Sequence, residues 1–163
     1  MKEKVKMGFE PVYDEESKIL ILGNFPSVKS REISFYYGNK QNRFWKTVCG
    51  FFNEEVPETT EEKILFLKRR KIALWDMVTE CEIEGSSDSS VKVKAVANLF
   101  PIFEKTKIRA VLLNGTLAYD LFVKEYAVYC EEKGIAYRKM PSTSPANPRF
   151  TKEKWEETLR DLL

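Results

Sequence analysis

The sequence contains no histidine among its 163 residues. Imidazole is the side chain that most often serves as general acid or base near neutral pH, and it is a common metal ligand. Its absence excludes Ser-His-Asp and Cys-His catalysis as well as zinc sites that use histidine. An active site in this chain must therefore work with amides, hydroxyls, carboxylates and basic side chains.

Cysteine is scarce and widely spaced, at Cys49, Cys81 and Cys130. No Cys-x-x-Cys motif is present, so the spacing supports neither a zinc ribbon nor an iron–sulfur cluster. A chain of this length can bury a core of its own and does not need a disulfide framework. We expect three buried or half-buried thiols, no metal ion, no iron–sulfur cluster and no cofactor.

Long apolar runs are absent as well. The longest, such as residues 19–22 and 110–113, are far too short to span a membrane. The first seven residues are polar and lack the apolar segment of a secretory signal. The length predicts one domain over residues 1–163, and we expect a soluble, cytoplasmic protein.

Four short apolar segments are typical of buried strands, and helical patterns lie between and after them. The strands are expected at residues 18–22, 71–75, 109–114 and 135–140. Helices are indicated around Phe44–Phe52, after the capping pair Thr59 and Glu62, over Thr116–Lys133 with Gly134 as the terminating glycine, and over Thr151–Leu163. Continuous apolar strands that alternate with helices predict an α/β fold: a single-domain three-layer α/β/α sandwich with a central, mainly parallel four-stranded sheet. Ligands bind such sheets beyond the carboxyl ends of the strands.

Positive charge is concentrated in two segments. Residues 23–50 carry five Lys or Arg against one Glu, and residues 138–154 carry five against one, so each has a net charge of +4. The whole chain has only +2, which leaves −6 for the remainder. Because both segments follow or overlap strand ends, a basic edge that binds a polyanion is predicted, with ordinarily charged loops as the alternative.

The segment from Gly23 to Trp45 combines flat aromatic rings with amides. Rings and amide edges together suit a site that holds a planar heterocyclic base. Asn42 stands where a helix begins, so its alternative role is that of an N-cap. Most of the aromatic residues fit an ordinary core, and Phe25 and Tyr36 are the two expected at the site.

Several motifs in this order resemble the uracil-DNA glycosylase superfamily, and most closely its hypoxanthine-DNA (deoxyinosine) glycosylase branch. They are G-N-F-P-S at 23–27, Y-Y-G-N-K-Q-N-R-F-W at 36–45, A-L-W-D at 73–76, G-S-S-D-S-S at 85–90, N-G-T-L-A-Y at 114–119 and P-S-T-S-P-A-N at 141–147. The resemblance covers nearly the whole chain. It departs from other branches where Phe25 stands in place of a water-positioning Asn, and where the later histidine is missing.

The resemblance implies a monofunctional enzyme that removes a deaminated base from DNA by hydrolysis, after the base has flipped out of the helix. Hypoxanthine is the first candidate base. The alternatives are uracil or xanthine, or a catalytically silent nucleic-acid-binding module on the same fold. We expect a monomer that binds DNA, with no membrane partner.

The site residues that follow from this comparison fall into three groups. Asn42 is the first candidate to position the attacking water, Asn39 is its rival, and Asp76 could bind the base or the water. The base would be bound by Asn24, Phe25, Tyr36 and Asn114. DNA contacts are expected from Ser27, Lys29, Ser30, Arg31, Gly115, Thr116, Ser142, Thr143, Ser144 and Asn147.

Overall fold

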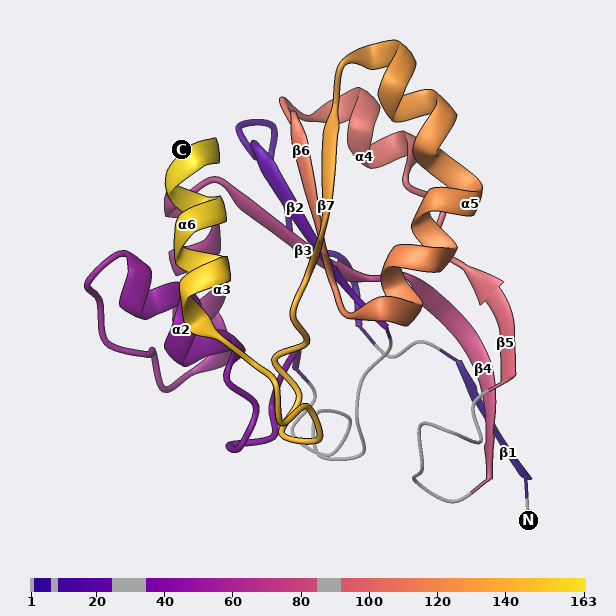
Figure 1. Ribbon diagram of the computed structural model, residues 1–163, viewed down its shortest axis with the longest axis horizontal. Helices are drawn as coiled ribbons and strands as arrows, with labels where there is room; N and C mark the ends of the chain where they lie inside the picture. The colour runs from indigo at the N-terminus through magenta and orange to yellow at the C-terminus, as the bar shows by residue number, and fades with distance from the viewer. Residues whose placement is uncertain (1, 7–8, 25–34, 85–91) are drawn as a thin grey trace.

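Four parallel strands form the central sheet of the computed structural model, which describes residues 2–6, 9–24, 35–84 and 92–163 (Figure 1). In spatial order the strands are β3 (Ile72–Asp76), β2 (Ile19–Gly23), β6 (Ala110–Asn114) and β7 (Ala136–Met140). Every neighbouring pair is parallel. The predicted strands agree with these bounds to within one residue, and the three-layer α/β/α fold is confirmed.

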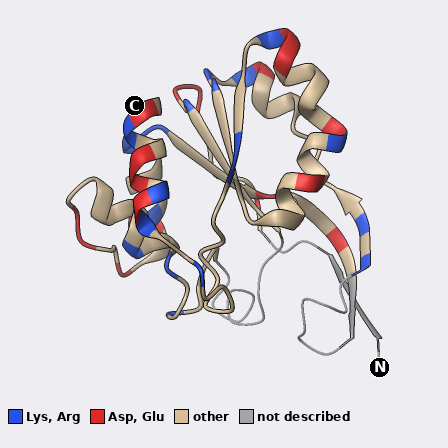
Figure 2. Ribbon diagram, in the orientation of Figure 1, with Lys and Arg blue, Asp and Glu red and all other residues tan. Residues whose placement is uncertain are grey.

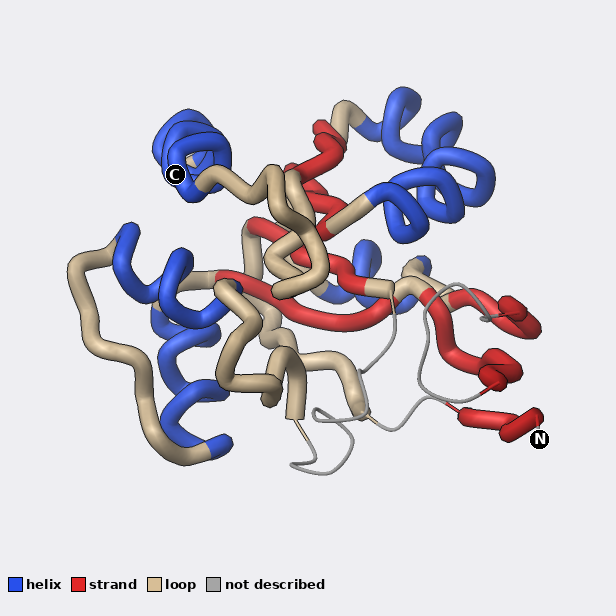
Figure 3. Tube along the Cα trace, turned by 60° about the horizontal axis from the view of Figure 1, so that its bottom comes forward, coloured by secondary structure: helices blue, strands red, loops and turns tan. Residues whose placement is uncertain are grey.

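Helices cover both faces of this sheet. On one face lie α2 (Phe44–Phe51), α3 (Thr60–Arg69) and α6 (Lys152–Leu162); on the other lie α4 (Phe100–Lys105) and α5 (Thr116–Lys133) (Figures 1 and 3). Side chains alternate between the faces of a strand, so β2 sends Ile19 and Ile21 to the first face and Leu20 and Leu22 to the second. This two-sided burial is why the strand is apolar throughout.

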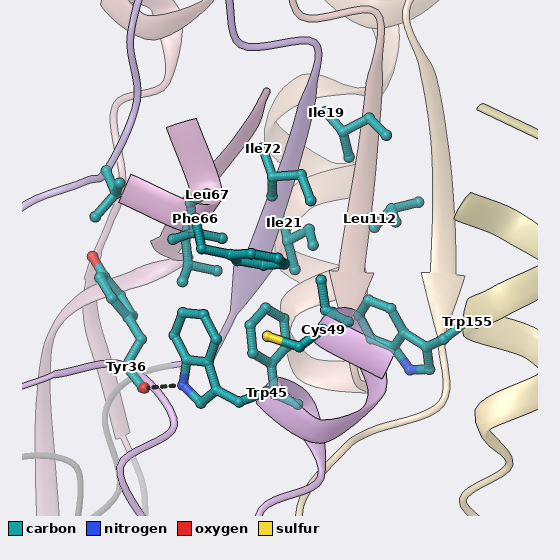
Figure 4. Packing of buried hydrophobic residues seen from close by; sticks show 14 of the residues in the cluster. Ile19, Ile21, Tyr36, Trp45, Cys49, Phe66, Leu67, Ile72, Leu112 and Trp155 are labelled. Atoms are coloured by element: carbon teal, nitrogen blue, oxygen red, sulfur yellow. Dashed lines mark hydrogen bonds between the residues drawn. The ribbon is translucent and has the colours of Figure 1, made fainter. Parts of the chain in front are cut away.

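Large aromatic side chains fill the core under α2, α3 and α6 (Figure 4). Trp155, Phe44 and Phe66 are among the largest fully buried side chains. The indole Nε1 of Trp45 donates to the backbone oxygen of Tyr36 at 2.9 Å, so burial leaves no polar atom of that ring unpaired. Each such side chain contributes about 1.5–3 kcal/mol by leaving water.

Two predicted helix ends are confirmed in atomic detail. The Thr59 hydroxyl accepts from the amide of Glu62 at 3.1 Å, which satisfies a free donor in the first turn of α3. Gly134 ends α5 with φ of +71°, and its amide donates to the backbone oxygen of Cys130. Glycine adopts this left-handed conformation without the steric cost that a side chain would add.

A second, antiparallel sheet was not predicted. It consists of β1 (Lys2–Lys6), β4 (Val78–Glu84) and β5 (Lys92–Val96) in the order β1-β4-β5. The chain runs from β3 into β4 through the single residue Met77, so the two sheets share one continuous path. The alternation of polar and apolar residues in β5 was a usable strand signal. The predicted loop at residues 84–90 lies almost wholly outside the described residues.

The order of the strands places a switch in the chain connections at β2. From β2 the chain crosses to β3 on one side and later to β6 on the other, so the connections diverge at β2. The gap beyond the carboxyl ends of strands at such a point is where open α/β sheets bind ligands. In the described part of the chain, no helix is long and apolar enough to cross a membrane.

Candidate active site

Two polar side chains and a glycine stand where three strands end, at the carboxyl edge of the sheet. Gly23, Asp76 and Asn114 are the last residues of β2, β3 and β6, and Tyr37 reaches this edge from the loop before α2. A Cβ atom on Gly23 would lie 2.7 Å from Asp76 Oδ1 and 2.8 Å from the Tyr37 hydroxyl. Glycine at position 23 is therefore what allows the carboxyl and the phenol to approach the same point.

Asp76 is the buried ionisable group of this site. Its side chain is 3% exposed, and its Oδ2 atom has no hydrogen-bond partner among the described residues. Removal from water raises the pKa of the carboxyl to about 7. Near neutral pH both the acid and the carboxylate are therefore populated, so Asp76 can donate or accept a hydrogen bond.

Tyr37 is a site residue that the sequence did not single out. Its ring stacks on Phe44 at 4.2 Å between centroids, which aims the hydroxyl toward Gly23. That hydroxyl is buried and has no hydrogen-bond partner in the described part of the chain. Burial, and to a smaller extent the charge of Asp76, raise the pKa of the Tyr37 phenol. The nearby side chain of Asn114 lowers this pKa by a smaller amount. Tyr37 therefore remains a neutral donor at every physiological pH.

The structure corrects the expectation for Tyr36, which was predicted to stack on a base. Its side chain is 2% exposed and packs edge-on against Phe9 and Phe35 in the core. Its hydroxyl donates to the backbone oxygen of Glu10 at 2.8 Å. Two adjacent tyrosines carry no sequence signal that distinguishes core from site. The backbone decides, because Tyr37 adopts a left-handed φ of +53°.

Asn114 fixes the loop that follows β7. Its Nδ2 group donates to the Thr143 hydroxyl, and its Oδ1 accepts from the Thr143 amide, each at 3.0 Å. The Thr143 side chain is 1% exposed, so the expectation that it contacts a phosphate is corrected: it anchors the loop. The Nδ2 and Oδ1 atoms of Asn114 thus each make one hydrogen bond to Thr143. A contact with a base would have to use the second N–H of Nδ2 or the second lone pair of Oδ1.

Asn24 links the end of β2 to α5, on the face of the sheet that α4 and α5 cover. Its Oδ1 accepts from the amide of Ala118 in the first turn of α5, at 2.9 Å. Its backbone oxygen accepts from the amide of Val78 at the start of β4. The amide of Gly115, predicted to bind a phosphate, donates to the backbone oxygen of Met140 at 3.2 Å. Thr116, the first residue of α5, is exposed and keeps that predicted role.

Asn39 and Asn42 shape the turn before α2. The Asn39 Oδ1 accepts from the amide of Gln41 at 2.9 Å, and the Asn42 Oδ1 accepts from the amide of Phe44 at 2.9 Å. The N-cap residue of α2 is Arg43, which makes no side-chain cap bond, so the alternative N-cap role of Asn42 is not confirmed; its side chain closes the turn one residue earlier. Both side chains are partly exposed. The two turn bonds described here use the Oδ1 atoms and not the Nδ2 groups. Their role toward water stays a prediction.

The loop from Pro141 to Arg149 is held by its own hydrogen bonds. The Ser142 hydroxyl accepts from the amide of Ser144, and the Asn147 Nδ2 group donates to the backbone oxygen of Ser142. The indole of Trp155 donates to the backbone oxygen of Pro141 at 2.8 Å. Ser142, Ser144 and Asn147 are partly exposed at the edge of the sheet, as a DNA contact requires.

Comparison with known proteins identifies the family of the chain. Residues 10–163 match the uracil DNA glycosylase superfamily. The chain belongs to this superfamily. It is 35% identical to a hypoxanthine DNA glycosylase of Methanosarcina acetivorans, over 96% of this chain and 99% of that protein. It is 32% identical to a hypoxanthine DNA glycosylase of Methanosarcina barkeri, over 95% and 98%.

A solved structure confirms the architecture of this superfamily member. The solution NMR structure of a candidate uracil DNA glycosylase from Methanosarcina acetivorans superposes with a TM-score of 0.81 at 34% identity, over 99% of both chains. The predicted resemblance to the superfamily is therefore confirmed.

Lysine and arginine residues of this glycosylase-superfamily chain occur on the α2 and α6 side of the sheet (Figure 2). Four of them are exposed: Lys40 and Lys46 before and in α2, and Arg149 and Lys152 before and in α6. The two basic segments of the sequence thus meet at one place. Five predicted site residues, Phe25, Ser27, Lys29, Ser30 and Arg31, lie outside the described residues. Within the part of the chain that is described, no three His, Cys, Asp or Glu side chains gather as a metal site would require.

Proposed function

We propose that this protein is a monofunctional DNA glycosylase that removes hypoxanthine from DNA. The observation that carries the proposal is the pair of buried polar side chains, Tyr37 and Asp76, at the carboxyl edge of the sheet. The near-full-length relatives named hypoxanthine DNA glycosylase support it. Action as a monomer stays a prediction. The cytoplasmic location stays a prediction.

The chemistry of Tyr37 and Asp76 suits hypoxanthine better than adenine. Hypoxanthine presents acceptors at N7 and O6, as guanine does, whereas adenine presents an amino donor at position 6. A neutral phenol and a protonated carboxyl are both donors, so together they satisfy O6 and N7 and leave the amino group of adenine facing another donor. A site built from buried unpaired donors rejects the wrong partner strongly.

Hydrolysis requires little more than placement and charge stabilisation. The bond from the base nitrogen to C1′ breaks, and its electron pair leaves with the base. The sugar passes through an oxocarbenium-like state, and the water oxygen then bonds to C1′ while a water proton neutralises the base. Hydrogen bonds from Tyr37 and Asp76 to the departing base would strengthen as negative charge develops on it, which lowers the barrier.

The water would be oriented by an amide. An amide is no general base at neutral pH, but its donor and acceptor groups can hold a water against C1′. Asn42 is our first candidate and Asn39 the second, because both stand on one short turn beside Tyr37. DNA would be held by the serines of the 141–149 loop with Asn147, by Thr116, and by the predicted residues Ser27, Lys29, Ser30 and Arg31.

The activity is tested with duplex oligonucleotides that carry a single inosine, uracil or xanthine, followed by alkali. We expect alkali-dependent strand breaks at inosine. Breaks without alkali would contradict a monofunctional enzyme, and faster release of uracil or xanthine would move the proposal to that base. No product from any substrate, together with retained DNA binding, would indicate a silent binding module.

The roles of the two amides are separated by substitutions that keep the turn. A serine hydroxyl can accept the same local backbone bond as asparagine, so Asn42→Ser can keep the bond to Phe44 while removing the amide. We expect Asn42→Ser to lose most turnover and to retain salt-dependent DNA binding. If Asn39→Ser loses turnover and Asn42→Ser does not, the water belongs to Asn39.

A further inference from the structure

Arg43 joins two parts of the site that are a hundred residues apart in the sequence. Its backbone amide donates to the Thr143 oxygen at 3.0 Å, and its Nε group donates to the same oxygen at 3.4 Å. Its guanidinium also donates to the backbone oxygens of Ser144 and, at 2.9 Å, of Asn147. The guanidinium carbon lies 4.3 Å from the centroid of the Phe150 ring. One side chain thus binds three carbonyls of the 141–149 loop.

Arg43 stands in the turn that carries Asn39 and Asn42, so its contacts connect that turn to the 141–149 loop. It follows Asn42 directly and precedes the first residue of α2, so its backbone belongs to the turn that carries both candidate water-binding amides. The loop that it holds is anchored on its other side by Asn114 at the end of β6. The turn and the loop are therefore fixed to each other and to the sheet.

We propose that Arg43 couples the 141–149 loop to the Asn39–Asn42 turn, so that the loop enters the DNA helix and the amides meet the extruded nucleotide as one rigid unit. Arg43 is a positioning residue in this role, since it acts through the loop. The inference rests on the proposed glycosylase function and adds to it a residue whose charge would otherwise be counted among the DNA contacts.

The physical reason is pre-organisation. A loop that is already ordered loses little conformational entropy when it displaces a base from the stack, whereas a loose loop must be ordered at that moment. Arginine suits the task because its planar fork of donors reaches several carbonyls at fixed angles. Lysine carries the same charge but only a compact ammonium group, so it cannot hold three carbonyls in this arrangement.

The test compares Arg43→Lys with the wild type on two substrates. One is a duplex with a paired inosine, which must be extruded, and the other is a single strand with the same inosine, which needs no extrusion. We expect roughly a tenfold or larger loss of single-turnover rate on the duplex, since at least one hydrogen bond from a charged donor is removed. On the single strand the rate should stay within about twofold of the wild type, because unstacking costs least there.

A matched control and a second variant make the outcome decisive. Arg160→Lys changes an exposed arginine of α6 that belongs to no part of the described site, and it should leave the ratio of the two rates unchanged. Phe150→Leu removes the contact between ring and guanidinium and keeps an apolar side chain against the core, and it should give the same duplex-specific loss at about two- to fivefold. This second variant keeps the test valid if Arg43→Lys does not fold.

Each result has one meaning. Equal losses on both substrates, or no loss on either, would overturn the coupling. The proposed function would fail separately, through a wild-type protein that releases hypoxanthine from neither substrate. Fluorescence of a 2-aminopurine placed beside the lesion reports extrusion directly, and a slower rise in Arg43→Lys is the expected signature.

Discussion

The two edges of the central sheet treat buried polar groups in opposite ways. At the amino edge Ser17 is fully buried, yet its hydroxyl accepts from the amide of Asp14, its amide donates to the Asp14 oxygen, and its oxygen accepts from the amide of Lys107. At the carboxyl edge Asp76 and Tyr37 are buried with polar atoms that no described residue satisfies. The same four strands therefore end in a satisfied edge and in an unsatisfied one.

This difference indicates where the fold has given up stability for function. An unsatisfied buried polar group costs about 1–3 kcal/mol, so a sheet edge that serves only stability would not keep two of them. Held in place by Phe44 and Gly23, these groups have fixed positions before any ligand arrives. Pre-organised donors of this kind are what an electrostatic transition state requires. Substitutions at the two edges test this contrast.

The largest effect is expected from Gly23→Ala. The added methyl group would lie under 3.0 Å from both Asp76 Oδ1 and the Tyr37 hydroxyl, so at least one of them must move. A displacement on the order of 1 Å in an active site can cost about a hundredfold in rate, and we expect a loss of that size in hypoxanthine release. The control is Gly50→Ala in α2, where a Cβ atom would meet nothing within 4 Å. If both variants retain full activity, the site does not depend on this close approach.

Asp76→Asn should produce the next largest effect, on stability and with a defined pH dependence. The pKa of the carboxyl is about 7 in the fold and 3.8 in its ordinary state, so the folded protein binds more protons between these values. The wild-type free energy of unfolding therefore falls as pH rises through this window and levels off above pH 7.

The neutral amide does not titrate, so the variant should gain stability relative to the wild type from pH 4 to 7, reaching roughly 2–4 kcal/mol. Urea unfolding at pH 4.5, 6 and 8 measures this difference, with Asp120→Asn on the exposed surface of α5 as the control. A stability difference that stays constant with pH would contradict a raised pKa. Wild-type excision should also decline above pH 7, as the protonated donor is lost.

Tyr37→Phe and Tyr126→Phe each remove one buried hydroxyl. The Tyr126 hydroxyl makes two hydrogen bonds, and the Tyr37 hydroxyl makes none with a described residue. The Tyr126 hydroxyl donates to the backbone oxygen of Ala97 and accepts from the amide of Leu99, so its loss should destabilise the protein by about 1–3 kcal/mol. The Tyr37 hydroxyl has no described partner, so its loss should be neutral or stabilising while the preference for hypoxanthine over adenine decreases. Equal destabilisation of the two variants, in thermal unfolding, would remove the contrast.

The smallest effect is expected at the amino edge, from Lys107→Met. Lys107 and Glu16 form an exposed ion pair at 2.8 Å, which raises the pKa of the lysine and lowers that of the carboxylate. Exposed pairs are screened by water and salt, so the midpoint of urea unfolding should change little and excision not at all. A clear loss of activity would show that the two edges are not independent.

The sequence predicts most of the central fold because its signals are local. The apolar runs of β2 and β6, the cap at Thr59 and the glycine after α5 each indicate a structure within a few residues. The antiparallel sheet was not predicted because its strands lack continuous apolar runs and its pairing is long-range: β1 pairs with β4, more than seventy residues later in the chain. Helix α4 is only six residues long and has a proline near its start, so it is too short for a periodic pattern.

The composition and the motifs of this chain were enough to determine its class of chemistry. Because the chain has no histidine, amides and one carboxylate are the candidate catalytic groups. The ordered motifs indicated the superfamily, which the comparisons confirm. Only the tertiary structure decided which groups share a site. In the structure Tyr36 is buried in the core, and Tyr37 reaches the carboxyl edge of the sheet. Thr143 anchors the loop after β7, and Arg43 donates hydrogen bonds to that loop. The reason is that exposure, pKa and mutual distance depend on residues far apart in the chain, which meet only when the strands are placed side by side.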